Sequence, residues 1–177
     1  MPRKKVFKAK FLNKRIIIDD KNSACDLFSK GSYGNLGEDK VLTLSIIEGL
    51  YLLEKGWIEI KKGLRKVKPE TLLKFAKDEE ANFWVRYCVY KDMRDRGYIL
   101  KTALKFGADF RVYSRGVKPG EDHAKWILYP VHESDKLTWH DFAAKNRVAH
   151  STKKRLNIAI VDDEGDITYY ECKWTKP

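Results

Sequence analysis

The apolar residues along the chain recur with two periods, which separate predicted strands from predicted helices. Alternating or short continuous apolar runs predict strands over residues 15–20, 57–60, 98–104, 109–114 and 125–131, and a hairpin over 155–174 with the acidic turn DDEGD. Helical spacing predicts helices over residues 23–31, 42–57, 78–96 and 138–151, and a further helical region that starts at Pro69. Both kinds of element therefore occur in both halves of the chain.

Capping residues indicate where these helices begin and end. Ser23 is the predicted N-cap of the first helix. In the segment 42–57, Leu44 begins an apolar stripe with helical spacing, Ser45 and Glu48 have the spacing of a capping box, and Gly56 ends the helix. The segment KKGLRKVK, residues 61–68, carries five Lys or Arg among its eight residues and is predicted to be an exposed loop.

A change in the kind and order of the predicted elements near residue 82 predicts two domains. The fold class is mixed α/β (α+β), with a small N-terminal α/β domain over residues 1–82. The C-terminal domain, residues 83–177, is predicted to have a central mixed sheet flanked by helices.

The composition favours a folded protein with a polyanionic partner. Apolar residues make up 43% of the 177 residues, and Lys and Arg exceed Asp and Glu by 36 to 25, which gives a net charge of +11. A basic excess of this kind favours nucleic acid, because each neutralised phosphate releases counterions. The three cysteines lack CxxC spacing, and no apolar run is long enough for a signal peptide or a membrane span. We therefore expect a cytoplasmic protein without a membrane partner.

The segment around residues 109–123 offers groups that can transfer protons. Alternation along the strand puts Asp109, Arg111 and Tyr113 on its more polar face, with Tyr113 at the strand end. A Gly- and Pro-containing loop follows and ends at His123, and Lys154 lies in a basic cluster after the helix 138–151. Taken singly, each residue is more often structural: a half-buried tyrosine, a loop histidine and a solvated lysine.

Cleavage of RNA by its own 2′-hydroxyl would use this set of groups. The protein must then supply a base for the hydroxyl, an acid for the departing 5′-oxygen and positive charge on the phosphorane. An imidazole, with an ordinary pKa of ~6.5, suits the acid role at neutral pH. A phenol, with an ordinary pKa of ~10, is a poor base unless nearby cations favour the phenolate, and Arg111 and Lys154 are the candidates for that task.

Three blocks of the second domain resemble the archaeal tRNA-splicing endonucleases, or tRNA-intron lyases. They are YKDMRDRGYILKTALKFGADFRVYSRG (90–116), EDHAKWILY (121–129) and RVAHSTKKRLNIAIVDDEGDITYYECKW (147–174), and they occur in the expected order. The first domain is similar mainly in LTLSIIEGLYLLEKGW. Ala103 stands where the family pattern has glycine. The resemblance implies that the C-terminal domain is the catalytic nuclease domain.

The resemblance also implies roles for individual residues. Tyr113 falls on the family's general base, His123 on its general acid and Lys154 on the charge that stabilises the transition state. The implied reaction requires no metal or other cofactor and leaves 2′,3′-cyclic phosphate and 5′-hydroxyl ends. A reversal of the acid and base roles stays open. Arg147 falls on an arginine that holds a bulged base by cation–π stacking.

The implied substrate and assembly follow from the same resemblance. The family cleaves precursor tRNA at bulge–helix–bulge motifs, reading RNA shape more than sequence. The acidic turn with Asp162, Asp163 and Asp166 resembles a loop that such subunits insert into a neighbouring subunit. A plain polar hairpin turn is the simpler alternative. Because one chain carries all three catalytic residues, a homotetramer is expected.

Two other functions remain alternatives. The segment ECK, 171–173, fits the acid-x-Lys element of metal-dependent, restriction-like nucleases, with Asp109 as the second metal carboxylate. A non-catalytic RNA-binding subunit is the other alternative, although such a subunit is expected to have lost the catalytic residues. His132, His140 and His150 are assigned no role, and Trp126, Trp139 and Trp174 are interpreted as core or interface residues.

Overall fold

The computed structural model of the chain describes residues 5–103 and 107–175. The chain divides into two compact units, Met1–Ala81 and Asn82–Pro177. Each unit has its own sheet, so the predicted mixed α/β class is confirmed. Within the described ranges no helix is long and apolar enough to cross a bilayer.

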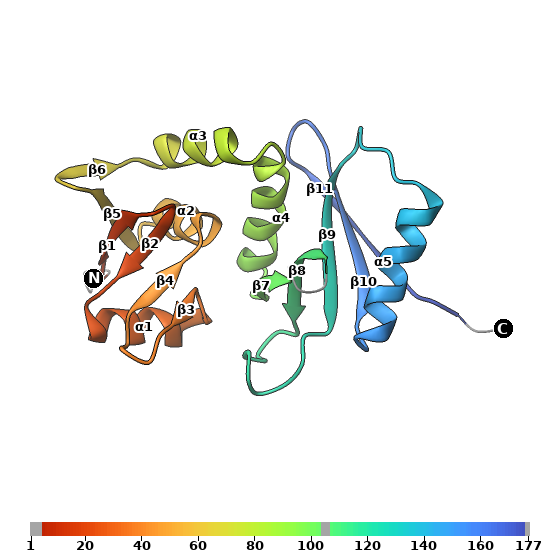
Figure 1. Ribbon diagram of the computed structural model, residues 1–177, viewed down its shortest axis with the longest axis horizontal. Helices are drawn as coiled ribbons and strands as arrows, with labels where there is room; N and C mark the ends of the chain where they lie inside the picture. The colour runs from red at the N-terminus through yellow and green to blue at the C-terminus, as the bar shows by residue number, and fades with distance from the viewer. Residues whose placement is uncertain (1–4, 104–106, 176–177) are drawn as a thin grey trace. The chain divides into compact units, whose positions relative to one another are not determined.

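The first unit contains a six-stranded sheet with the strand order β3-β4-β2-β1-β5-β6 (Figure 1). Its strands are β1 (Phe7–Leu12), β2 (Arg15–Ile18), β3 (Asn35–Leu36), β4 (Leu42–Leu44), β5 (Ile58–Lys62) and β6 (Arg65–Val67). Its helices are α1 (Lys21–Gly31), α2 (Ile46–Glu54) and α3 (Pro69–Glu79). The buried positions of the sheet, among them Phe7, Ile16, Leu44 and Ile58, fall on one face, and α1 and α2 pack against that face.

Three local predictions for the first unit are wrong. The N-cap of α1 is Asp20, whose carboxylate accepts the Ser23 N–H at 2.8 Å, because an aspartate three residues earlier reaches the free amides first. Leu44 lies in strand β4 and not on the helical stripe, since it pairs with Ile16 of β2. The basic segment 61–68 is exposed as predicted, but it forms the β5–β6 hairpin instead of a loop.

The capping box of α2 is confirmed. The Ser45 hydroxyl accepts the Glu48 N–H, and the Glu48 carboxylate accepts the Ser45 N–H at 3.0 Å. The other Glu48 oxygen accepts the Gly34 N–H at 2.7 Å, so this buried carboxylate also ties the preceding turn to the helix. Gly56 follows the helix with a φ of +65°, as its predicted terminator.

The second unit contains a five-stranded mixed sheet with the order β11-β10-β9-β8-β7. Its strands are β7 (Ile99–Ala103), β8 (Ala108–Tyr113), β9 (Trp126–His132), β10 (Arg155–Val161) and β11 (Ile167–Cys172). Only β9 and β10 run parallel within this sheet, and α5 connects them. Residue 104, which ends the strand predicted at 98, lies outside the described residues.

Helices α4 (Phe83–Asp95) and α5 (Trp139–Ser151) cover opposite faces of this sheet (Figure 1). On the α4 face Tyr90 packs on Phe110, with ring centroids 5.9 Å apart. On the α5 face Ala149 packs against Ile127 and Leu156. Thr138 caps α5 by accepting the Asp141 N–H at 3.1 Å, at the start predicted from the sequence.

Candidate active site

Three strand ends meet at one edge of the second sheet. Because β8 runs antiparallel to β9, and β9 runs parallel to β10, the carboxyl end of β8 lies beside the amino ends of the other two strands. Two backbone hydrogen bonds join them there: Lys125 N–H donates to the Val112 carbonyl at 2.9 Å, and Arg155 N–H donates to the Lys125 carbonyl at 3.0 Å. Residues one or two positions beyond these bonds therefore project into the same space.

The loop between β8 and β9 is folded into two turns. Val117 N–H donates to the Ser114 carbonyl and Glu121 N–H to the Lys118 carbonyl, both at 3.1 Å. Gly116 and Gly120 have φ values of +81° and +100°, which residues with a Cβ rarely adopt. The second turn returns the chain to the sheet edge at Asp122 and His123.

Lys154 is positioned by the cap of α5. Lys154 N–H donates to the Ala149 carbonyl at 2.8 Å and Lys153 N–H donates to the His150 carbonyl at 3.0 Å, which together form a Schellman motif. Lys153 occupies the left-handed position with φ +54°. The Lys154 ammonium donates to the Thr152 carbonyl at 2.9 Å, next to the negative end of the helix dipole.

A cavity of about 470 Å³ at this sheet edge brings together Tyr113, His123 and Lys154. Its lining consists of Arg111, Tyr113, Pro119, Gly120, Glu121, Asp122, His123, Ala124 and Lys154. Tyr113 is only 4% exposed, Lys154 is half-buried and His123 is exposed. The Arg111 guanidinium lies 6.0 Å from the Tyr113 ring centroid, so a phenol, an imidazole and two cations share one space.

The bulge in β8 changes the predicted position of Asp109. The pairing with β7 shifts between Thr102 and Ala103, which interrupts the alternation at Asp109. Its carboxylate bonds Arg86 of α4 at 2.7 Å, and that guanidinium lies 5.3 Å from the Phe110 ring centroid. Asp109 therefore reaches toward α4, and the prediction that it shares a face with Arg111 is wrong.

The carboxylates of the metal-dependent alternative are far apart. Asp109 lies in β8 and Glu171 in β11, with two strands between them, which corresponds to roughly 14 Å at ~4.8 Å per strand spacing. Glu171 accepts the Trp126 indole N–H at 2.6 Å and the Arg155 Nη1 at 3.0 Å. These donors, the indole first, lower the pKa of Glu171. The two carboxylates cannot hold one ion together.

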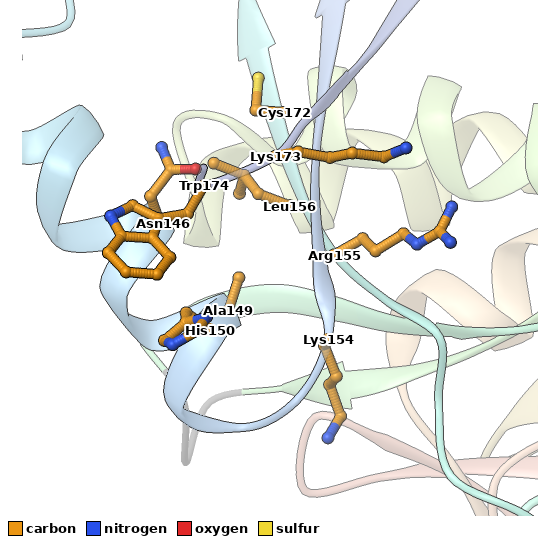
Figure 2. A pocket seen from close by; sticks show the side chains of 9 residues that line it. All are labelled: Asn146, Ala149, His150, Lys154, Arg155, Leu156, Cys172, Lys173 and Trp174. Atoms are coloured by element: carbon orange, nitrogen blue, oxygen red, sulfur yellow. The ribbon is translucent and has the colours of Figure 1, made fainter. Parts of the chain in front are cut away.

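A second hollow of about 310 Å³ lies between the end of α5 and strands β10 and β11 (Figure 2). His150 and Trp174 line it, with ring centroids 4.6 Å apart, and Lys154 lines both hollows. In Figure 2 the Lys154 side chain extends away from Trp174. Burial raises the pKa of the Cys172 thiol in the lining. Sequence periodicity gave no signal for this hollow, since its residues come from separate elements.

The remaining predicted residues lie outside both hollows. Arg147 is exposed on α5. Within the turn, the Asp162 carboxylate accepts the Glu164 and Asp166 N–H groups at 3.0 and 2.8 Å. Asp163 is 87% exposed, and its carboxylate lies 3.1 Å from His132 Nε2.

Of the three tryptophans interpreted as core or interface residues, two lie outside the core. Trp139 and Trp174 are 86% and 58% exposed, so neither belongs to the core of its unit. Trp126 is half-buried and donates its indole N–H to Glu171. An apolar side chain near the end of an element can be left uncovered, and sequence spacing does not reveal it.

Comparison with known families covers both units. Residues 83–169 match the family model for the catalytic C-terminal domain of tRNA intron endonuclease, and residues 7–73 match the model for its N-terminal domain. A tRNA-splicing endonuclease of Pyrococcus furiosus is 43% identical over 162 residues, which cover 92% of each chain. One of Nanoarchaeum equitans is 46% identical over 153 residues, which cover 82% of this chain and 97% of the relative. A third, of Methanothermobacter thermautotrophicus, is 42% identical and covers 85% of this chain and 87% of the relative. The chain therefore belongs to the tRNA intron endonuclease family.

Proposed function

We propose that this protein excises introns from precursor tRNA by a metal-independent transphosphorylation at the cavity of Tyr113, His123 and Lys154. The observation that carries the proposal is the presence of these three side chains, from two strand ends and a loop, in one cavity lining. All of them lie in the unit Asn82–Pro177, whose first residue is one position before the domain boundary predicted from the sequence. We assign the catalytic domain to residues 83–177 and the N-terminal domain to residues 1–82.

The proposed reaction needs only groups that this cavity contains. Tyr113, as phenolate, removes the proton of the 2′-hydroxyl, and the 2′-oxygen attacks the adjacent phosphorus. The bond from phosphorus to the 5′-oxygen breaks, and His123 gives that oxygen a proton. Lys154 and Arg111 offset the negative charge that develops on the phosphorane. The products are a 2′,3′-cyclic phosphate and a 5′-hydroxyl.

The two residues assigned to proton transfer, Tyr113 and His123, differ in exposure. Tyr113 is almost fully covered, and the Arg111 guanidinium lies 6.0 Å from its ring centroid. His123 is exposed on its loop, where it can exchange protons with water between turnovers.

The proposed substrate is RNA that contains a bulge–helix–bulge motif, and we assign Arg147 to stack on one of its splayed bases. Arg147 is exposed on α5, which is the requirement for such a contact. Because α5 ends at the cap that positions Lys154, a base held on this helix is connected to the cavity by a rigid element.

The proposed assembly is a homotetramer in which the turn at Asp162, Asp163 and Asp166 contacts a neighbouring subunit. The Asp162 carboxylate bonds the turn's own amides and so fixes its shape. Asp166 is exposed, and Asp163 is also exposed although its carboxylate lies 3.1 Å from His132 Nε2. We propose that both carboxylates face cations of another chain.

The decisive experiment incubates the purified protein with an intron-containing precursor tRNA in EDTA and analyses the product ends. We expect cleavage with cyclic phosphate and 5′-hydroxyl ends, and no cleavage where the scissile nucleotide carries 2′-deoxyribose. Cleavage of the deoxy substrate at an equal rate, or loss of activity in chelator, contradicts the proposal. His123→Ala should slow cleavage roughly 10²–10⁴-fold with RNA binding retained, and His140→Ala, an exposed histidine of α5, serves as the matched control.

A further inference from the structure

One face of the first sheet carries lysines on neighbouring strands. Lys8 and Lys10 of β1, Lys61 of β5 and Lys66 of β6 are exposed on the face opposite the apolar core, and we call these four residues the lysine face. The alternate residues of the same strands, such as Ala9 and Ile60, are buried beneath α1 and α2.

The strand register places like charges side by side. Lys10 pairs directly with Lys61, and Lys61 pairs directly with Lys66, so three lysines form a row across three strands. Neighbouring strands are ~4.8 Å apart, and like charges directly opposite one another destabilise a sheet. Repulsion within such a row opposes folding to the extent that nearby carboxylates do not offset it.

Acidic neighbours offset only part of this charge. Asp19 pairs with Lys10, and Glu59 bonds Lys66 at 2.8 Å. Among the described residues, Lys8 and Lys61 make no close ion pair, although Glu59, which lies opposite Lys8 in the register, attracts both of them while it bonds Lys66. The face therefore keeps a positive excess.

Protection of a sheet edge does not account for these lysines. Lysine on an edge strand blocks pairing with other chains, and β6 is such an edge. Strands β1 and β5, however, are paired on both sides, and three of the four lysines belong to them.

A hollow of about 480 Å³ lies on this face. Its lining is Lys8, Ala9, Lys10, Phe11, Leu12, Asp19, Glu59, Lys61 and Gly63. Three of the lining residues are exposed lysines, Lys8, Lys10 and Lys61. A groove of this kind suits an extended chain of negative charges.

We propose that the lysine face is a second RNA-binding surface, which contacts the phosphodiester backbone away from the cleaved bond and without reading sequence. The inference rests on the proposed function in that precursor tRNA is the polyanion. Lysine is depleted at protein–protein interfaces, whereas phosphate contacts use it routinely, so the observations favour RNA over an acidic protein.

The test compares Lys8→Gln/Lys61→Gln with the charge-matched control Lys21→Gln/Lys74→Gln, whose lysines are exposed on α1 and α3. The probe is precursor tRNA with 2′-deoxyribose at the cut sites, titrated at several salt concentrations. We expect the slope of log affinity against log salt to fall by about 1 per lysine, and the affinity to fall about tenfold per lysine at ~0.1 M salt. The control substitutions should change both the salt slope and the affinity by less than this. Thermal melting checks that both variants are folded.

A third variant should change RNA affinity and the salt slope in the opposite direction. Glu59→Gln removes a carboxylate from the same face and should tighten RNA binding with a steeper salt slope. Equal affinity and slope for the lysine-face variant and the control overturn the proposal. A changed particle mass in the lysine-face variant with unchanged RNA affinity overturns it in favour of a protein contact.

The result of this binding test can be distinguished from the result of the cleavage test of the proposed function. If the chain cleaves no precursor tRNA, the same titration with a plain RNA duplex still decides whether the lysine face binds phosphates. If it does cleave, single-turnover cleavage at saturating RNA should proceed at the wild-type rate in the lysine-face variant. A reduced rate at saturation contradicts a role confined to binding.

Discussion

At the scale of single residues, backbone conformation governs the position of Lys154. The Schellman motif fixes its backbone through the bond to the Ala149 carbonyl, and this motif requires its neighbour Lys153 to be left-handed. Glycine usually fills that position because a Cβ is disfavoured there. The chain thus accepts local strain one residue away from a proposed catalytic group.

Lys153→Gly should stabilise the protein by roughly 0.5–1 kcal/mol, because removal of the left-handed strain outweighs the added entropy of glycine in the unfolded chain. Denaturant unfolding measures the change. Lys153→Ala is the control, since it removes the same ammonium group and keeps the Cβ. Equal stabilities of the two variants would show that the φ of +54° carries no cost here.

At the scale of elements, α2 packs very closely on β2. A Cβ built on Gly49 would overlap Cδ1 of Ile16, which is fully buried in the core of the first unit. The glycine is therefore needed for close approach of helix and sheet, although its φ is not left-handed.

Gly49→Ala should destabilise the first unit by about 1–3 kcal/mol through overpacking, despite the better helix propensity of alanine. Chemical denaturation measures the loss. Ile16→Val removes the Cδ1 methyl group that the added Cβ would meet. The Gly49→Ala/Ile16→Val double variant should therefore be nearly as stable as the Ile16→Val single variant. A destabilisation that is simply additive in the two substitutions would rule out this contact as the cause.

Glu171 joins three strands of the second sheet and makes their stability depend on pH. Its pKa is lowered in the folded protein by the Trp126 indole N–H and by Arg155. A depressed folded-state pKa contributes stability that is present above the unfolded value of about 4.3 and is lost as the pH falls through the folded value.

Glu171→Gln should therefore lower stability most at neutral pH, and the difference from the wild type should shrink as the pH falls below about 4. Thermal melting across pH 3–7, in steps of about one unit, follows the effect. Glu133→Gln, in an exposed position of the same unit, should give no such convergence. A difference that stays constant with pH would show that packing and not charge is responsible.

At the scale of the whole molecule, the proposed assembly depends on charge at one turn. Asp162 is committed to the turn's own amides, whereas Asp163 and Asp166 expose their carboxylates. The structural and the proposed intersubunit roles are therefore separable by mutation.

Asp163→Asn/Asp166→Asn should reduce the particle mass measured by light scattering, because the turn loses the charge that attracts a basic neighbour. The far-UV circular dichroism should stay unchanged, since the Asp162 bonds are kept. Glu133→Gln serves as the charge control. An unchanged mass would mean that the acidic turn makes no subunit contact.

Much of the fold could be predicted because local rules decide it. The capping box at Ser45 and Glu48 and the cap at Thr138 satisfy nearby amides, so sequence spacing is enough to find them. Leu44 was mispredicted because pairing with Ile16, which is distant in sequence, determined its structure. The β5–β6 hairpin is a local pairing, but its run of basic residues lacks the apolar alternation that marks a strand.

The sequence by itself determined most of the element types, the basic charge and, through resemblance, the three residues proposed to act on RNA. These are properties of local spacing and residue chemistry. Only the tertiary structure decided that β8, β9 and β10 end at one edge, so that Tyr113, His123 and Lys154 line one cavity. It also decided that Lys10, Lys61 and Lys66 stand side by side. The pairing of β1 with β5, and of β9 with β8 and β10, joins segments that are separated in the chain, so spacing along the sequence does not show which side chains become neighbours.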